Sequence, residues 1–167
     1  MITDLLAIPV LIVAAMLQMV VISRMPLLGG SADLMLLLVV AWGLLEEKPA
    51  VWIWALVAGG LVSFLSALPI PVGLLSYLIA MALARVLQRR IWQSPLLAML
   101  VVTLIATLIQ HLLSIVVLQF GGANLPFSES VQVVALPSTL LNMFLALPVY
   151  ALMNDLHRWI HPSEVRA

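Results

Sequence analysis

The chain contains no cysteine, which excludes disulfide bridges, thiol catalysis and cysteine-ligated metal sites. Charged residues are also scarce, at 8% of 167 residues, whereas 65% of the residues are hydrophobic. A water-soluble domain needs far more charge than this to cover its surface. The formal net charge is zero, so nothing in the composition indicates nucleic acid as a partner. These absences favour an integral membrane protein.

Motifs for catalysis and nucleotide binding are missing as well. The chain has no HExxH motif, no P-loop and no paired carboxylates within an apolar run. Its acidic side chains lie at the ends of apolar segments, as for Asp33, Glu46, Glu47, Glu129 and Asp155. Ion-coupled pumps normally carry charges within their spans. We therefore expect a protein that is neither an enzyme nor a pump, without a cofactor or a metal.

Six apolar runs are candidates for membrane-spanning helices. A helix needs about 20 apolar residues to cross a hydrocarbon core of about 30 Å. The runs cover residues 5–22, 32–45, 50–68, 72–87, 96–118 and 131–153. The sequence therefore predicts an all-α integral membrane protein, a bundle of six transmembrane helices that forms a single polytopic domain over residues 1–167.

Basic residues and tryptophans predict the orientation of this bundle. With six spans, six of the seven bases and all five tryptophans lie on one side, and Arg24 is the only base on the other. Cytoplasmic loops retain Lys and Arg, and tryptophan anchors at the headgroups, so both termini are expected in the cytoplasm. In a rival topology of five spans residues 34–45 are re-entrant, which places all seven bases inside and the N-terminus outside.

The fifth run carries one polar stripe, made up of Thr103, Thr107, Gln110, His111 and Ser114. At 100° per residue these side chains fall within an arc of roughly 100°, so they should face the bundle interior, another subunit or a water-filled cleft. One interpretation is a ligand site or a proton relay through His111. The other is hydrogen bonding between helices, with Asn142 or Gln18 as partner. His111 has no carboxylate at its depth, which disfavours a relay or a hydrolase dyad.

Small residues recur at every fourth position in the third and fourth runs. The third run carries Ala55, Gly59 and Ser63, and the fourth carries Ser76, Ala80 and Ala84. Such stripes let helix backbones approach closely, which drives helix association in lipid. They are explained either by packing of the two runs against each other or by contact with the transmembrane helix of a partner.

Three polar features near the ends of the runs have structural interpretations. Asp33 precedes an apolar helix, where its carboxylate can cap free N–H groups. The segment Glu46-Glu47-Lys48 is expected to be a solvated cytoplasmic turn. His157 and His161 have the i, i+4 spacing of a metal chelate, but two histidines without a third ligand favour a structural role.

Three sequence blocks, taken in order and with their spacing, resemble the MreD family of rod shape-determining proteins. The first block comprises residues 32–40, in which Asp33 precedes a Leu-rich run. The second comprises the Gly-rich residues 59–66 and the following Pro71-Val72-Gly73-Leu74 with Tyr77. The third is Leu136-Pro137-Ser138-Thr139-Leu140-Leu141-Asn142. The chain departs from the family at Ala32, where a proline is usual, and near Ser63, where an aspartate is usual.

The resemblance implies a non-enzymatic scaffold subunit of the elongasome, in the bacterial cytoplasmic (inner) membrane, that supports cell shape and lateral peptidoglycan synthesis. It implies direct contact with the transmembrane helix of MreC. RodA, a class-B penicillin-binding transpeptidase and cytoplasmic MreB would belong to the same assembly. MreD-like proteins are also similar in fold to the substrate-binding S subunits of energy-coupling-factor vitamin transporters. This similarity gives the alternative function, in which the polar stripe would line the vitamin pocket.

Overall fold

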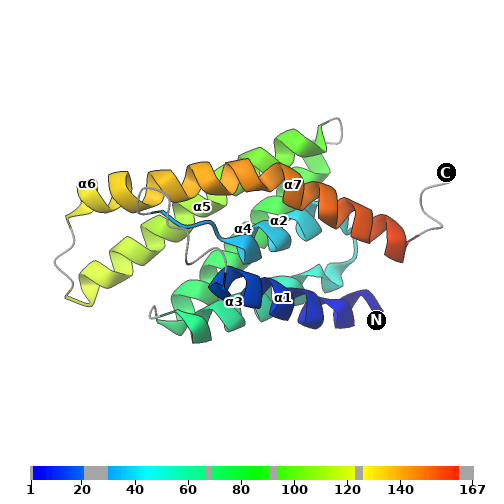
Figure 1. The fold of residues 1–167 in the computed structure, drawn as a ribbon, viewed down its shortest axis with the longest axis horizontal. Coiled ribbons are helices and arrows are strands. Elements are labelled where there is room, and N and C mark those ends of the chain that lie inside the picture. Colours follow the sequence, from blue (N-terminus) through cyan, green and yellow to red (C-terminus); the bar gives the residue numbers. More distant parts are fainter. Residues whose placement is uncertain (1, 21–29, 67–68, 91–93, 123–125, 162–167) are drawn as a thin grey trace.

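The computed structural model describes residues 2–20, 30–66, 69–90, 94–122 and 126–161 (Figure 1). Every element in these ranges is helical. The long helices are α1 (Ile2–Val20), α2 (Leu34–Leu45), α3 (Trp52–Leu65), α4 (Ile70–Arg90), α5 (Pro95–Phe120) and α7 (Leu136–Ile160). A short 3-10 turn, η2 (Pro49–Val51), precedes α3, and α6 (Phe127–Ser130) runs through the π-helical turn η3 (Val131–Ala135) into α7.

In the described ranges, three helical segments are long and apolar enough to cross a membrane. They are residues Ile70–Arg89, Pro95–Phe120 and Phe127–Ile160, the last combining α6, η3 and α7. Shorter apolar helices cover Ala7–Val20, Leu34–Leu45 and Pro49–Leu65. The predicted all-helical fold is confirmed for the described residues, and its three long apolar helices are those expected of a membrane protein. Six crossings and cytoplasmic termini stay predictions.

Helices that follow one another in the chain run in opposite directions. Gln18, near the end of α1, contacts Leu34 at the start of α2. Ser63, near the end of α3, contacts Ile70 at the start of α4. At the opposite end of the bundle, the last residues of α4 and α7 lie beside Glu46, which follows α2. The contacts therefore give the up-and-down order that six spans would need.

Helix α2 lies at the centre of the bundle, between α1 and α3 on one side and α5 and α7 on the other (Figure 1). All ten residues from Met35 to Leu44 are buried. Its 12 residues make a helix roughly 18 Å long, which is shorter than a hydrocarbon core of about 30 Å. The predicted run of residues 32–45 is therefore a short helix enclosed by protein. It begins only at Leu34.

Two tryptophans lie inside the bundle instead of at its surface. The rings of Trp42 and Trp54 stack with centroids 4.6 Å apart, and each residue is 1% exposed. The expectation that tryptophans anchor the chain at the headgroups is wrong for this pair, because Trp42 of α2 and Trp54 of α3 pack against each other between the two helices. Trp52 and Trp159 are exposed, and Trp92 lies outside the described residues.

Candidate functional site

The most extensive polar network in the described part of the chain is centred on Asp33. This residue is the N-cap of α2, and its Oδ1 accepts a hydrogen bond from the Leu36 amide at 3.0 Å. The Tyr77 hydroxyl of α4 lies 2.7 Å from both carboxylate oxygens. Gln110 of α5 donates from Nε2 to Oδ2 at 2.8 Å. One carboxylate therefore ties α2 to α4 and α5.

Helix α7 joins the same network through Asn142 and Ser138. Asn142 Oδ1 accepts from the Asp33 amide at 2.7 Å, and its Nδ2 donates to Thr107 Oγ1 at 3.0 Å. Ser138 Oγ accepts from the Ser31 amide at 3.1 Å. These bonds satisfy the extended backbone before α2, which would otherwise be unpaired inside apolar surroundings.

Gln18 completes the network from α1. Its Nε2 donates to the Ala32 carbonyl at 3.0 Å, and its Oε1 accepts from the Leu34 amide at 2.7 Å. The backbone can pass this close to α7 because Gly30 has no side chain. A Cβ on Gly30 would lie 2.5 Å from the Ser138 amide nitrogen. Five helices thus meet at one short extended segment.

The Asp33 carboxylate lies within the bundle and not at its end. Tyr77 is seven residues into α4, roughly 10 Å along its axis, and Gln110 is ten residues before the end of α5, roughly 15 Å. Asp33 lies at the end of an apolar segment, as expected, because it is the N-cap of α2, but this helix begins inside the bundle. Among the described residues no Lys or Arg bonds to it, so neutral donors hold this carboxylate.

The structure places the five residues of the polar stripe in unequal surroundings. Thr107 and Gln110 bond to Asn142 and Asp33, and Ser114 Oγ donates to the Gln110 carbonyl at 2.8 Å. Thr103 is buried, and its hydroxyl has no hydrogen-bond partner in the described ranges. His111 is half-buried and makes no hydrogen bond with any described residue, but it interacts electrostatically with Asp33. The expectation that no carboxylate lies at the depth of His111 is therefore wrong, since Asp33 also bonds to the adjacent Gln110. Bonding between helices accounts for the part of the stripe that is engaged.

The small-residue stripes lie inside the bundle, where α3 packs closely on α4. All six residues of these stripes are buried by the chain itself: Ala55, Gly59, Ser63, Ser76, Ala80 and Ala84. A Cβ on Gly59 would lie 2.9 Å from Leu74 Cα, and one on Gly73 would collide with Ser63 Oγ. Internal packing accounts for these six residues. A partner helix would therefore have to contact other side chains.

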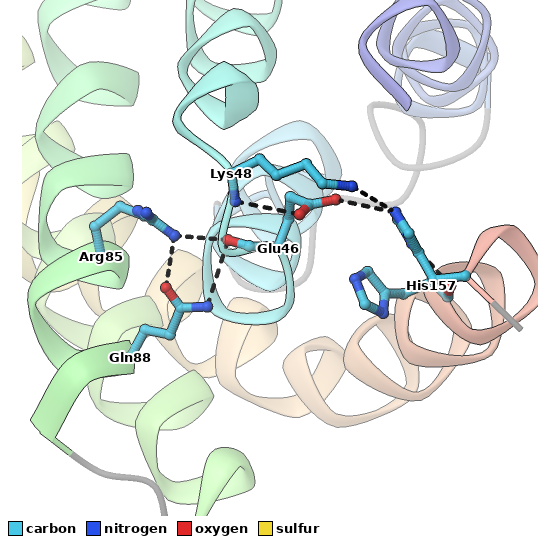
Figure 2. Close-up of polar contacts among 6 residues, drawn as sticks. Glu46, Lys48, Arg85, Gln88 and His157 are labelled. Atoms are coloured by element: carbon cyan, nitrogen blue, oxygen red, sulfur yellow. Dashed lines mark hydrogen bonds and ion pairs between the residues drawn. The ribbon is translucent and has the colours of Figure 1, made fainter. Parts of the chain in front are cut away.

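A second polar cluster lies at the opposite end of α2, around Glu46 (Figure 2). Arg85 of α4 donates to the Glu46 carbonyl at 2.6 Å and to the Glu47 carbonyl at 2.8 Å. Gln88 donates to the same Glu46 carbonyl at 3.3 Å. Glu46 is only 5% exposed, so the expectation of a solvated turn is wrong for this residue. Arg85 and Gln88 therefore satisfy carbonyls directly after α2, where no further helical turn supplies a donor.

Three surface pockets surround these clusters. The largest, about 690 Å³, lies beside Glu46, Lys48, His157 and His161. A second, about 330 Å³, lies between α1, α2 and α3, and a third, about 270 Å³, lies beside Arg85 and Gln88. None of these three pockets is lined by the polar stripe of α5.

Sequence reasoning missed the roles of two residues. Tyr77 sits in an apolar run, where a tyrosine resembles any other core aromatic until its hydroxyl partner is located. Three charged residues in a row indicate a solvated turn, which conceals the role of Glu46. Its position directly after an apolar run is the one signal that the end of this helix could be enclosed.

Comparisons with known proteins give no relative: no protein-family model, no curated protein and no solved structure matches the chain. Its function must therefore be argued from its own residues. Asp33, Tyr77 and Asn142 come from the three separate sequence blocks described above, and the structure brings them together in one network.

Proposed function

We propose that the chain is an MreD-type scaffold subunit of the elongasome, without catalytic activity, that binds the transmembrane helix of MreC in the bacterial cytoplasmic membrane. RodA, the class-B penicillin-binding transpeptidase and MreB would assemble around the same complex. The proposal starts from the order and spacing of three sequence blocks that resemble this family.

The observation that carries the proposal is the meeting of these blocks at Asp33. The first block supplies Asp33, the second supplies Tyr77 at 2.7 Å, and the third supplies Asn142 at 2.7 Å from the Asp33 amide. Blocks separated by tens of residues therefore act as one structural unit. This unit holds the central helix α2 in place. Such a structural role suits a scaffold and needs no catalytic group.

The chain offers mainly uncharged helix faces to a partner within the membrane. Large apolar side chains are exposed on α1, α3, α5 and α7, including Met19, Leu65, Phe120 and Phe144. The pocket of about 330 Å³ next to the Asp33 network is lined by Ala15, Met19, Met35 and Leu65, with Gln18 and Ser66 at its polar part. We choose this groove as the first position at which to test contact with the MreC helix.

Complementation tests the function directly. The host is a rod-shaped bacterium whose cells become round when its own MreD is depleted. Expression of this chain together with its cognate MreC should restore the rod shape, and MreC should co-purify with the chain. Asp33→Ala should abolish both effects. Glu129→Ala is the matched control, because Glu129 is exposed in α6. Absence of MreC from preparations of the folded natural chain would refute the scaffold.

The lack of natural cysteine makes cross-linking a clean test of the groove. Met19→Cys and Leu65→Cys should form disulfides with single cysteines in the MreC transmembrane helix. Leu152→Cys, which is exposed on α7, should not. Cross-links that form only at Leu152→Cys would support the scaffold function but would show that MreC binds at α7 and not in the groove.

The alternative, a vitamin-binding S subunit, needs the α5 stripe to line a ligand pocket. Thr107 and Gln110 are instead bonded to Asn142 and Asp33. No specific observation favours a vitamin site, so we do not develop this function further. A vitamin that co-purifies at near-equimolar amounts would bring it back.

A further inference from the structure

Three ligand-type side chains converge at the basic end of the bundle from two distant parts of the sequence. Glu46 follows α2, while His157 and His161 lie at the end of α7. One ligand atom from each of the three lies within 4.8 Å of the other two. Figure 2 shows Glu46 between Arg85 and Gln88 on one side and Lys48 and His157 on the other. The sequence supplied the histidine pair, and the fold supplies the missing third ligand.

The Glu46 carboxylate has an unused oxygen that points into this cluster. Its Oε1 accepts from the Lys48 amide at 3.2 Å. Its Oε2 is buried and has no hydrogen-bond donor among the described residues, and its nearest cationic candidate is His161 Nε2 at 3.7 Å. That separation is an ion-pair distance and is too long for a hydrogen bond. A buried carboxylate oxygen left in this state is costly unless a cation approaches it.

The His161 ring is held in the orientation that a metal ligand needs. Its Nδ1 lies 3.3 Å from the His157 carbonyl oxygen and donates to it. The proton on Nδ1 leaves the lone pair on Nε2, and this atom faces Glu46. Metal-binding histidines typically donate their second ring nitrogen to a carbonyl or carboxylate, which fixes the tautomer in the same way.

Lys48 shows that this position attracts positive charge. Its Nζ lies 3.2 Å from His161 Nε2 and donates to the same lone pair. Lys48 is exposed and flexible, so its ammonium can leave toward solvent when a stronger cation arrives. Its charge opposes a metal ion at short range, which makes Lys48 a competitor of the metal and not a ligand.

We propose that Glu46, His157 and His161 bind a divalent transition metal, with zinc as the best match. Two imidazoles and one carboxylate are a typical zinc ligand set, whereas calcium and magnesium prefer oxygen ligands alone. Ligand atoms around tetrahedral zinc lie roughly 3.4 Å apart. The three ligand atoms lie within 4.8 Å of one another, so their separations must contract by up to about 1.4 Å. The fourth position opens toward the pocket of about 690 Å³, and the bound ion links the end of α7 to the end of α2.

Metal titration of the full-length chain in detergent tests this proposal. The protein should carry an affinity tag free of histidine, and zinc binding is measured by competition with a chromophoric chelator. Cobalt(II) substitution gives a second readout, because tetrahedral coordination produces intense visible absorption bands. We expect one zinc per chain and a tetrahedral cobalt spectrum. Absence of binding by the natural chain would overturn the proposal.

Variants separate this site from other metal-binding groups. Glu46→Gln, His157→Gln and His161→Gln should each weaken zinc binding at least about tenfold. Lys48→Met should strengthen it roughly fivefold, because a nearby positive charge is removed. His111→Gln is the matched control, since His111 is the third histidine and lies in α5. Equal affinity in all five variants would refute the assignment, and so would zinc binding that appears only after Lys48 is replaced.

Folding is checked by tryptophan emission before any metal is added. The His157 ring lies edge-on to Trp42 with centroids 5.6 Å apart, so a change in emission on adding metal then reports the site. His161 lies one residue beyond α7, and His161→Gln therefore keeps the helix even where Glu46→Gln does not fold. A folded His161→Gln variant with unchanged cobalt bands would be sufficient to overturn the proposal.

Discussion

The Tyr77 hydroxyl lies 2.7 Å from both carboxylate oxygens of Asp33 and joins the first half of α4 to the first turn of α2. Tyr77 is fully buried, and Asp33 receives its other hydrogen bonds from Leu36 and Gln110. Water cannot easily replace a donor at this depth. The phenol is therefore a main support for a charge that no described basic residue balances.

Tyr77→Phe should lower the free energy of unfolding by about 1–3 kcal/mol, because the carboxylate loses a donor and nothing replaces it. Unfolding is measured by SDS titration in mixed micelles, followed by tryptophan emission. Tyr150→Phe is the control, since Tyr150 is buried in α7 but makes no hydrogen bond with described residues. Equal losses in both variants would show that ring packing, and not the Asp33 bond, is being measured.

Two adjacent glycines of α3 make a second matched pair. A Cβ on Gly59 would lie 2.9 Å from Leu74 Cα, which is backbone and cannot rotate away. A Cβ on Gly60 meets nothing within 4 Å. Gly59→Ala should therefore destabilise the chain by about 1–3 kcal/mol, while Gly60→Ala should be neutral or stabilise it by up to about 1 kcal/mol. Thermal unfolding of the purified variants distinguishes the two. A stable Gly59→Ala variant would mean that α3 and α4 can separate without loss.

Arg85 should stabilise the chain through the carbonyl groups that directly follow α2. Its guanidinium donates to the Glu46 and Glu47 carbonyls at 2.6 and 2.8 Å. Arg85→Ala removes both bonds and should lower the free energy of unfolding by about 1.5–3 kcal/mol, and Arg85→Lys should recover only part of this, because lysine lacks the two-pronged donor. Arg89→Ala, at an exposed position one turn later, should change stability by less than about 0.5 kcal/mol. The same SDS titration measures all three.

Sequence patterns were sufficient for the class of the protein and for most of its long helices, because apolar runs in lipid have few alternatives to helix. Residues 96–118 and 72–87 correspond closely to α5 and α4. The predicted run of residues 131–153 covers η3 and most of α7 but ends seven residues before the end of α7 at Ile160. The polar end of α7 was missed because its solvent-facing residues do not add to an apolar run, although they continue the same helix.

The position of Asp33 could not be predicted, because depth in a bundle is a tertiary property. A carboxylate before an apolar run marks the start of a helix but not the membrane surface. Helix α2 is only 12 residues long, and its start lies inside the bundle beside Tyr77 and Gln110. The Glu46 cluster has the same origin. The i, i+4 histidines were visible in the sequence, but their third ligand is 111 residues away from His157 and is brought there by the packing of α2 on α7.

The number of spans can be decided at the N-terminus, since six spans place it with the C-terminus and five place it opposite. Gln18 at the end of α1 contacts the start of α2, so α1 runs against α2 and both would cross in the six-span arrangement. In the six-span arrangement, green fluorescent protein fused before Met1 should fluoresce in a bacterial host, and alkaline phosphatase fused there should be inactive. Fusions after Ala167 should behave in the same way. Active phosphatase at the N-terminus with fluorescence at the C-terminus would instead establish five spans, and α2 would then be a re-entrant helix that never reaches the outer surface.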